Sequence, residues 1–135
     1  MPEGVGYGPQ FTSSTGLTLN YIGEHCYAYS GNVSVNNVET TLLLFDTGSS
    51  LVVSQVQFRY ASSGTAEITE DFSFRLYLND EFIMSSRAKA DTEWFAEQFV
   101  RLIISPYTTV KVTFDSDDTV ADRVSTGSLT GRIYK

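Results

Sequence analysis

The stretch that decides the fold is residues 72–81, with the sequence FSFRLYLNDE. Apolar and more polar side chains alternate along it, so that a strand would place on one face Phe72, Phe74, Leu76 and Leu78. Asn79 and Asp80 tolerate the left-handed backbone of a tight turn. The stretch therefore predicts a strand with one buried face, which folds back at these two residues into a hairpin.

The same alternation recurs along most of the chain, separated by turn residues. The expected strands are residues 17–22, 26–35, 38–45, 51–60, 66–69, 72–78, 81–86, 99–105, 108–115 and 126–134. Two of them contain unbroken apolar runs, 42–45 and 102–104, which indicate central strands covered on both faces, by a sheet on one side and a neighbouring chain on the other. Residues 91–98 (DTEWFAEQ) are either one short helix or an irregular loop.

These strands leave little of the chain for a helical layer. With 135 residues and 15.0 kDa, the chain is long enough for one domain. An all-β chain of this length closes its core either as a two-sheet antiparallel sandwich or as a barrel. We expect the sandwich, of jelly-roll type, over residues 21–135.

Residues 1–20 differ from the rest in holding four of the ten glycines and two of the three prolines. Their few apolar residues cannot build a core of their own. The segment is expected to be an extended N-terminal arm, which is either a loose terminus or a strap that orders against a neighbour.

Charge and composition exclude several classes of function. The net charge is −7, and no Lys or Arg precedes Arg59, so the sequence predicts neither a nucleic-acid partner nor a membrane partner. One cysteine, Cys26, and one histidine, His25, leave no disulfide and no metal site of zinc-binding spacing. No cofactor is expected. The N-terminus also lacks the basic and apolar blocks of a signal peptide.

One motif carries chemistry. Residues 43–50 (LLFDTGSS) resemble the active-site loop of aspartic proteases, in which paired aspartates share a proton around a water. A single copy at Asp46 would require a homodimer of retroviral type. However, the apolar-apolar-Gly segment and the helix that pack beneath such a loop are missing, because Ser105 and Pro106 follow the run at 102–104. We therefore interpret Asp46-Thr47-Gly48 as a β-turn and expect no catalytic residues.

The strand-and-turn pattern as a whole resembles a group of viral proteins. Residues 40–60, 74–84, 102–112 and 128–134 are similar to small β-sandwich structural proteins of tailed bacteriophages, and the resemblance covers about residues 38–134. It implies a jelly-roll capsid decoration, or cement, protein that binds the major capsid protein on the capsid exterior of the virion, commonly as a homotrimer. That group has no catalytic residues to carry over.

A decoration protein acts through many small contacts that symmetry multiplies. Aromatic side chains dominate such interfaces, so the arm residues Tyr7, Pro9 and Phe11 are the expected partner-binding residues. The second choices on the domain itself are Tyr77, Tyr107 and Tyr134. An alternative function is a tail-fibre or receptor-binding module, in which Trp94 or Tyr107 would stack on glycans.

Overall fold

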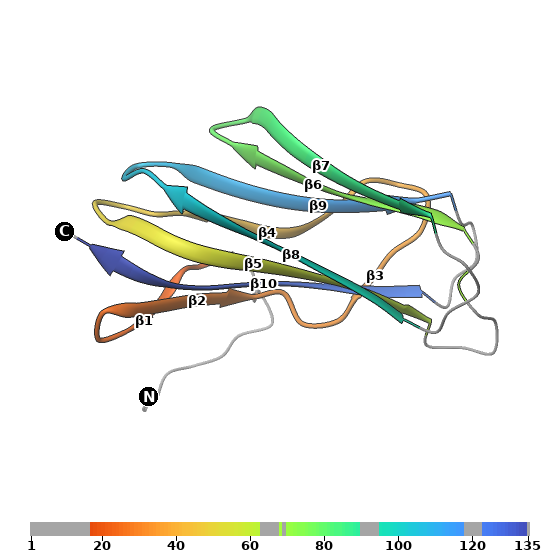
Figure 1. The fold of residues 1–135 in the computed structure, drawn as a ribbon, viewed down its shortest axis with the longest axis horizontal. Helices are drawn as coiled ribbons and strands as arrows, with labels where there is room; N and C mark the ends of the chain where they lie inside the picture. The colour runs from red at the N-terminus through yellow and green to blue at the C-terminus, as the bar shows by residue number, and fades with distance from the viewer. Residues whose placement is uncertain (1–16, 63–67, 69, 90–94, 118–122, 135) are drawn as a thin grey trace.

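The computed structural model describes residues 17–62, 68, 70–89, 95–117 and 123–134. These residues contain strands and no helix, in two antiparallel sheets that face each other (Figure 1). The strands are β1 (Asn20–Ile22), β2 (His25–Tyr29), β3 (Val33–Ser34), β4 (Thr40–Asp46), β5 (Leu51–Ser62), β6 (Asp71–Leu78), β7 (Glu81–Lys89), β8 (Phe95–Ile104), β9 (Thr109–Ser116) and β10 (Arg123–Tyr134). The expected all-β sandwich is confirmed.

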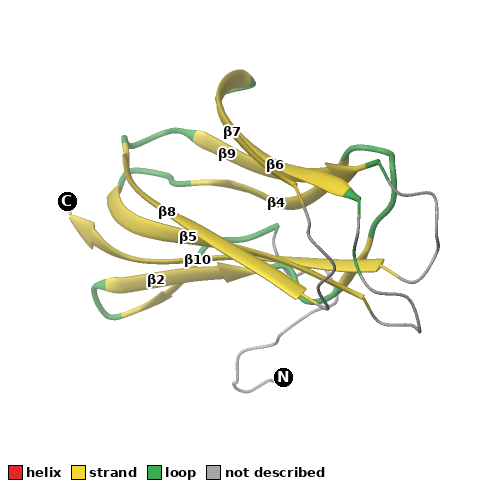
Figure 2. Cartoon of the chain, turned by 45° about the vertical axis from the view of Figure 1, so that its right-hand side comes forward, coloured by secondary structure: helices red, strands yellow, loops and turns green. Residues whose placement is uncertain are grey.

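The order of the strands identifies the jelly roll. One sheet has six strands in the order β1-β2-β10-β5-β8, with β3 also paired to β10, and the other has four in the order β4-β9-β6-β7. From β7 onward the chain changes sheet at every connection, as the two layers of Figure 2 show. Without β1 and β3, each sheet has four strands, which is the eight-strand arrangement of a jelly roll.

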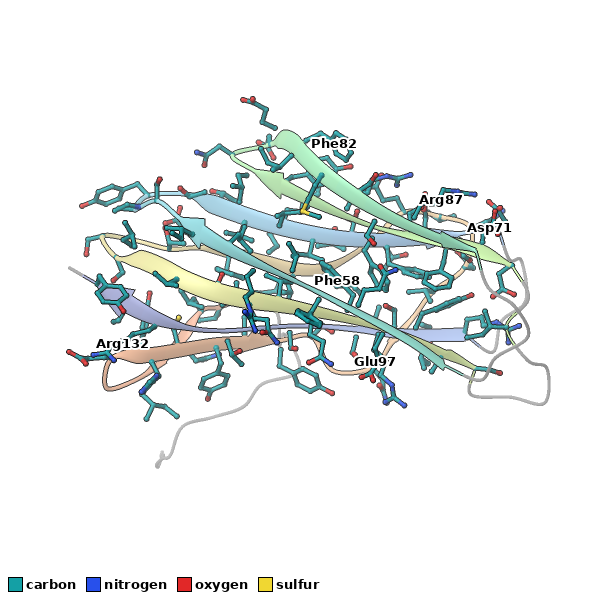
Figure 3. The ribbon with its side chains drawn as sticks, viewed as in Figure 1. Phe58, Asp71, Phe82, Arg87, Glu97 and Arg132 are labelled. Carbon is teal, nitrogen blue, oxygen red and sulfur yellow. The ribbon has the colours of Figure 1, made fainter. Side chains whose placement is uncertain are left out.

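The hydrophobic core lies between the two sheets and is mainly aromatic. Phe58 of β5 stacks on Phe74 of β6 with ring centroids 4.6 Å apart, and Figure 3 shows Phe58 between the layers. Tyr60 packs against Phe114 at 4.5 Å and Phe72 at 4.9 Å. The predicted inward residues of β6, Phe72, Phe74 and Leu76, are buried, and Leu78 is half-buried. Period-two patterning therefore located this part of the core.

The hairpin predicted at Asn79 and Asp80 is present. Both residues have positive φ, 54° and 65°, as a tight two-residue turn requires. The turn joins β6 to β7, which pair from Leu78 and Glu81 outward.

Four predicted segments differ, in whole or in part, from the observed strands. The runs 42–45 and 102–104 lie on β4 and β8, which are edge strands and not central ones. A bulge in β4 turns both Leu42 and Leu43 inward, which explains that run without a second covering layer. Residues 95–98 are strand and not helix, while 91–94 lie outside the described residues. The strand expected at 26–35 is divided into β2 and β3.

The predicted N-terminal arm and the predicted strand 66–69 lie mostly outside the described residues. Residues 1–16 are outside the described part of the chain, so the arm stays a prediction. Leu19, at the end of the predicted arm, is buried in the core. Of residues 66–69 the structure describes Ile68, which is fully buried in the core.

Candidate interaction surface

The outer face of the four-stranded sheet is covered by polar side chains that bind one another. Arg75 Nη1 lies 2.9 Å from Asp115 Oδ2 and 3.5 Å from Glu39 Oε1. Thr113 and Tyr77 donate hydroxyl hydrogen bonds to Glu39 Oε2, at 2.6 Å and 2.7 Å. These two hydrogen bonds, helped by the nearby cation of Arg75, hold the pKa of Glu39 below its ordinary value. The polar groups of this face are therefore largely satisfied within the chain.

On the same face, side chains near both ends of β7 also make contacts within the chain. At one end the Arg87 guanidinium lies 3.2 Å from Asp117 and 3.5 Å from Asp71 (Figure 3). Toward the other end, the exposed ring of Phe82 meets the Tyr77 ring edge-on, at a centroid distance of 5.7 Å. Tyr77, one of the expected partner-binding residues, is thus already engaged by its own chain.

The outer face of the six-stranded sheet has a different character beside its β8 edge. Val53 and Ile103 are direct cross-strand partners on β5 and β8, and they are 42% and 67% exposed. Phe99 of β8 is 62% exposed and pairs with Gln57. Three large apolar side chains thus share one side of a sheet face, a grouping that marks contact surfaces more often than scattered apolar residues do. We call Val53, Phe99 and Ile103 the β5–β8 patch.

A shallow depression lies at the Val53 end of the β5–β8 patch. It has a volume of about 380 Å³ and is lined by Val53, Ser54, Gln55, Arg101, Leu102, Ile103 and Thr130. Arg101 Nε donates to Gln55 Oε1 at 3.4 Å, which leaves the other nitrogens of the guanidinium available to a partner. The depression is suited to a side chain that combines an apolar stem with an acidic or carbonyl oxygen.

The charge of this face is opposite to that of the whole chain. Its outward positions carry Arg59, Arg101 and Arg132, whereas Glu97 is an outward acid on β8. Arg132 is partly neutralised by Glu24 at 2.6 Å, and Figure 3 shows it at the opposite end of the sheet from Glu97. Arg132 is paired with Glu24 and Arg59 lies opposite Glu97, so the uncompensated positive charge of this face is at Arg101, whose cross-strand partner is the uncharged Gln55. Arg101 therefore favours an acidic group on a partner surface.

The Asp46-Thr47-Gly48 segment is a structural turn between β4 and β5. Asp46 Oδ1 accepts a 2.7 Å hydrogen bond from the Gly48 amide, and Gly48 has φ of +63°. The buried Thr47 hydroxyl donates to the Ser105 carbonyl and accepts from the Thr108 amide, both at 3.0 Å. The motif thus binds the β8–β9 loop to the β4–β5 turn, as the interpretation of a β-turn requires.

His25 and Cys26 do not form a site together. They are consecutive residues of β2, and His25 is exposed while Cys26 is buried. Burial raises the pKa of the Cys26 thiol. Among the residues that the structure describes, no group of three or more potential metal-ligating side chains comes together.

Only some of the expected partner-binding residues lie in the described part of the chain. Tyr7, Pro9, Phe11 and Trp94 lie outside the described residues. Tyr107 is 72% exposed at the tip of the β8–β9 loop with φ of 58°, and its amide donates to the Gly48 carbonyl. Tyr134 is half exposed, with the Arg132 guanidinium 5.6 Å from its ring centroid. The three tyrosines proposed on the domain thus lie in different environments.

Sequence reasoning missed the β5–β8 patch. It treated Leu102-Ile103-Ile104 as a fully covered run, whereas Ile103 points outward. A usable signal was present, because Glu97, Arg101 and Ile103 fall at alternate positions on one side of the strand, whereas Val100, Leu102 and Ile104 fall on the other. This alternation extends the strand back to 97 and puts Ile103 on its charged, outer side.

In the described part of the chain, no helix has the length and apolar composition needed to cross a bilayer.

Comparison with known proteins gives a fold and no family. No protein-family model matches the chain, and no curated protein matches it significantly. A chain of the T13 IBDV viral particle superposes with a TM-score of 0.51 and 12% identity over 96% of this chain and 35% of its own length. The insecticidal delta-endotoxin Cry8Ea1 from Bacillus thuringiensis matches with a TM-score of 0.46 and 14% identity over 77% of this chain and 20% of its own. This chain thus spans about a third or less of these proteins, and its likeness to the viral-particle chain is one of fold.

Proposed function

We propose that this chain is a structural protein of a virus particle that binds the outside of a protein shell as a decoration or cement protein. The observation that carries the proposal is the contrast between the two outer faces. The four-stranded sheet pairs its polar groups internally around Glu39 and Arg75, and its exposed Phe82 packs on Tyr77 of the same chain. The six-stranded sheet instead exposes Val53, Phe99 and Ile103, the β5–β8 patch, on one face. The fold likeness to a chain of a viral particle supports the same class of role.

The β5–β8 patch can supply a modest affinity per copy. Full burial of an aliphatic or aromatic side chain is worth about 1.5–3 kcal/mol. Because Val53, Phe99 and Ile103 are 42%, 62% and 67% exposed, burial of the remaining surface against a partner would contribute about 1–2 kcal/mol each. Such a contact is weak for one copy but strong when a symmetric shell binds many copies at once.

The charge pattern specifies the partner surface further. Arg101 borders the depression beside Val53, and Arg132 on β10 is the direct cross-strand partner of Val53. Arg59 lies farther along β5 on the same face, opposite Glu97. The major capsid protein would meet this face with acidic side chains or carbonyl oxygens around a small apolar contact. The predicted arm would add a second contact through Tyr7, Pro9 and Phe11.

The proposal is tested by co-sedimentation with shells of the major capsid protein assembled without this chain. We expect the wild-type chain to pellet with the shells, and Phe99→Ser to weaken binding at least tenfold. Phe82→Ser is the matched control, because Phe82 is similarly exposed but lies on the four-stranded sheet. Equal binding by Phe99→Ser and wild type, or no pelleting by either, would contradict the proposal.

Copy number separates a shell protein from a tail protein. Quantitative mass spectrometry of purified particles should find hundreds of copies if the chain decorates the shell. A handful of copies would favour the receptor-binding alternative, for which the exposed Tyr107 is the best placed described residue. In that case a glycan array should show binding that Tyr107→Ala abolishes.

A further inference from the structure

Strand β8 is a free edge of the six-stranded sheet. It is ten residues long and pairs with β5 along its full length, from Phe95 opposite Ala61 to Ile104 opposite Val52, without a register shift. On its other side no strand is paired with it in the described part of the chain. Its backbone therefore offers a long row of donors and acceptors to another strand.

The other three sheet edges carry features that discourage pairing. Strand β1 is only three residues long. Strand β4 is bulged at Leu42, and β7 is bulged at Ile83. Short and bulged edges are the usual protection against edge-to-edge association. Strand β8 has neither feature, and its sequence FAEQFVRLII contains no proline.

The outward side chains of β8 complement a second copy of the same strand. Glu97 and Arg101 lie two positions to either side of Phe99 on the outer face. In the described part of the chain neither has an ion-pair partner. Glu97 accepts a hydrogen bond from Gln57 Nε2 at 3.2 Å, and Arg101 donates to Gln55 at 3.4 Å. Both partners belong to β5, on the side of β8 away from the free edge.

We propose that β8 pairs antiparallel with β8 of a second copy, in the register that places the two Phe99 residues opposite each other. In this register Glu97 of each copy lies opposite Arg101 of the other, so the ion pair forms twice about a two-fold axis. Moving the centre of the pairing by one residue, to Gln98 or Val100, removes both ion pairs. A Val100 centre would place Glu97 opposite Ile103, and Phe99 opposite Arg101.

This contact needs no shell and goes beyond the proposed function. It would join the six-stranded sheets of two copies edge to edge, so that both β5–β8 patches share one continuous face. Because such a contact has two-fold symmetry, it predicts a homodimer in place of the homotrimer that the bacteriophage resemblance implies.

The first test is the mass of the full chain by sedimentation equilibrium across a range of concentrations. We expect a reversible dimer of twice 15.0 kDa. Glu97→Arg and Arg101→Glu should each weaken the dimer at least tenfold, because each variant places like charges opposite each other. The double variant Glu97→Arg/Arg101→Glu should restore it. Arg87→Glu, on the edge strand of the other sheet, is the control and should not change the dimer.

The second test fixes the register by cross-linking. In an antiparallel pair, directly opposed residues have Cα atoms about 4.5–5.5 Å apart, which suits a disulfide. Phe99→Cys in a Cys26→Ser background should therefore form a covalent dimer under mild oxidation, and Val53→Cys in the same background should not. A monomer at all concentrations, or a trimer insensitive to the charge reversals, would overturn the proposal. So would a dimer that Phe99→Cys cannot cross-link.

Discussion

Arg123 and Glu70 form an ion pair that is almost withdrawn from water. Arg123 Nε lies 2.9 Å from Glu70 Oε2, and the two side chains are 3% and 11% exposed. The pair joins the start of β10 to the segment before β6, and so connects the two sheets. The Tyr60 hydroxyl also donates a hydrogen bond to Glu70. Burial raises the pKa of Tyr60, and this hydrogen bond raises it further. The pair thus closes the end of the core where Tyr60 lies.

Removal of the Glu70 carboxylate should cost much of the stability of the fold. Glu70→Ala removes the carboxylate 2.9 Å from the buried Arg123 guanidinium, and breaking a buried ion pair costs about 3–5 kcal/mol. Urea unfolding followed by tryptophan fluorescence would measure the loss. The double variant Glu70→Leu/Arg123→Met should recover most of it, because neither charge remains buried. A loss below about 1 kcal/mol in Glu70→Ala would contradict this account.

Two glycines of β10 should respond differently to alanine. A Cβ on Gly131 would lie 2.5 Å from the Val53 carbonyl oxygen and 3.0 Å from Ser54 Cα, both backbone atoms of β5. Since β5 and β10 are both interior strands of the six-stranded sheet, they cannot separate freely, and Gly131→Ala should cost about 2 kcal/mol or more. Thermal unfolding would detect a fall in Tm of at least several degrees.

Gly127→Ala is the matched control on the same strand. Its Cβ would meet the Leu42 and Leu43 side chains, with the nearest contact at 3.2 Å. Side chains can shift by a few tenths of an ångström more easily than the backbone of a neighbouring strand. We therefore expect a smaller loss of stability at Gly127, and a larger loss there than at Gly131 would show that the close approach at Val53 is unimportant.

Glu39 should make a small, measurable contribution to the pH dependence of stability. Its pKa is lowered in the folded chain, so the unfolded chain binds its proton more readily. The stabilisation is present above the unfolded pKa, near 4.3, and is lost as the pH falls through the lowered folded pKa. Because the side chain is 39% exposed, solvent screening keeps the effect below about 1 kcal/mol.

The comparison that isolates this contribution is wild type against Glu39→Gln. Between about pH 5 and pH 3, the free energy of unfolding should fall less in the variant than in the wild type. Tyr77→Phe removes one hydrogen bond to the carboxylate, and NMR titration should then show the Glu39 pKa closer to its ordinary value. Identical pH profiles for all three proteins would argue against the network on the four-stranded sheet.

How far the sequence predicts this structure depends on the range of the interactions. Alternation over a few residues is local, so Phe72, Phe74 and Leu76 were placed correctly, as was the turn at Asn79. Which strands lie at the edges depends on pairings between distant segments, such as β5 with β8. An apolar run therefore looks the same in the sequence whether its strand lies at the edge or at the centre of a sheet. The inward position of Leu42 is explained only by the bulge in β4.

The candidate surface was hidden from the sequence for the same reason. Val53 and Ile103 are fifty positions apart and become neighbours only through the pairing of β5 with β8. The Arg123–Glu70 pair likewise joins residues that no local pattern connects. Turn chemistry, in contrast, is local, and the interpretation of Asp46-Thr47-Gly48 as a β-turn agrees with the structure.

Substitutions in that turn distinguish the structural interpretation of the motif from the catalytic one. Thr47→Val leaves the buried Thr108 amide without its hydroxyl acceptor and the Ser105 carbonyl without its donor, so it should cost about 2 kcal/mol. Thr47→Ser keeps the hydroxyl and should cost less. Asp46→Asn keeps an oxygen acceptor for the Gly48 amide and should stay within about 0.5 kcal/mol of wild type. A peptidase activity at acid pH that disappears in Asp46→Asn, while the fold is unchanged, would instead make Asp46 catalytic.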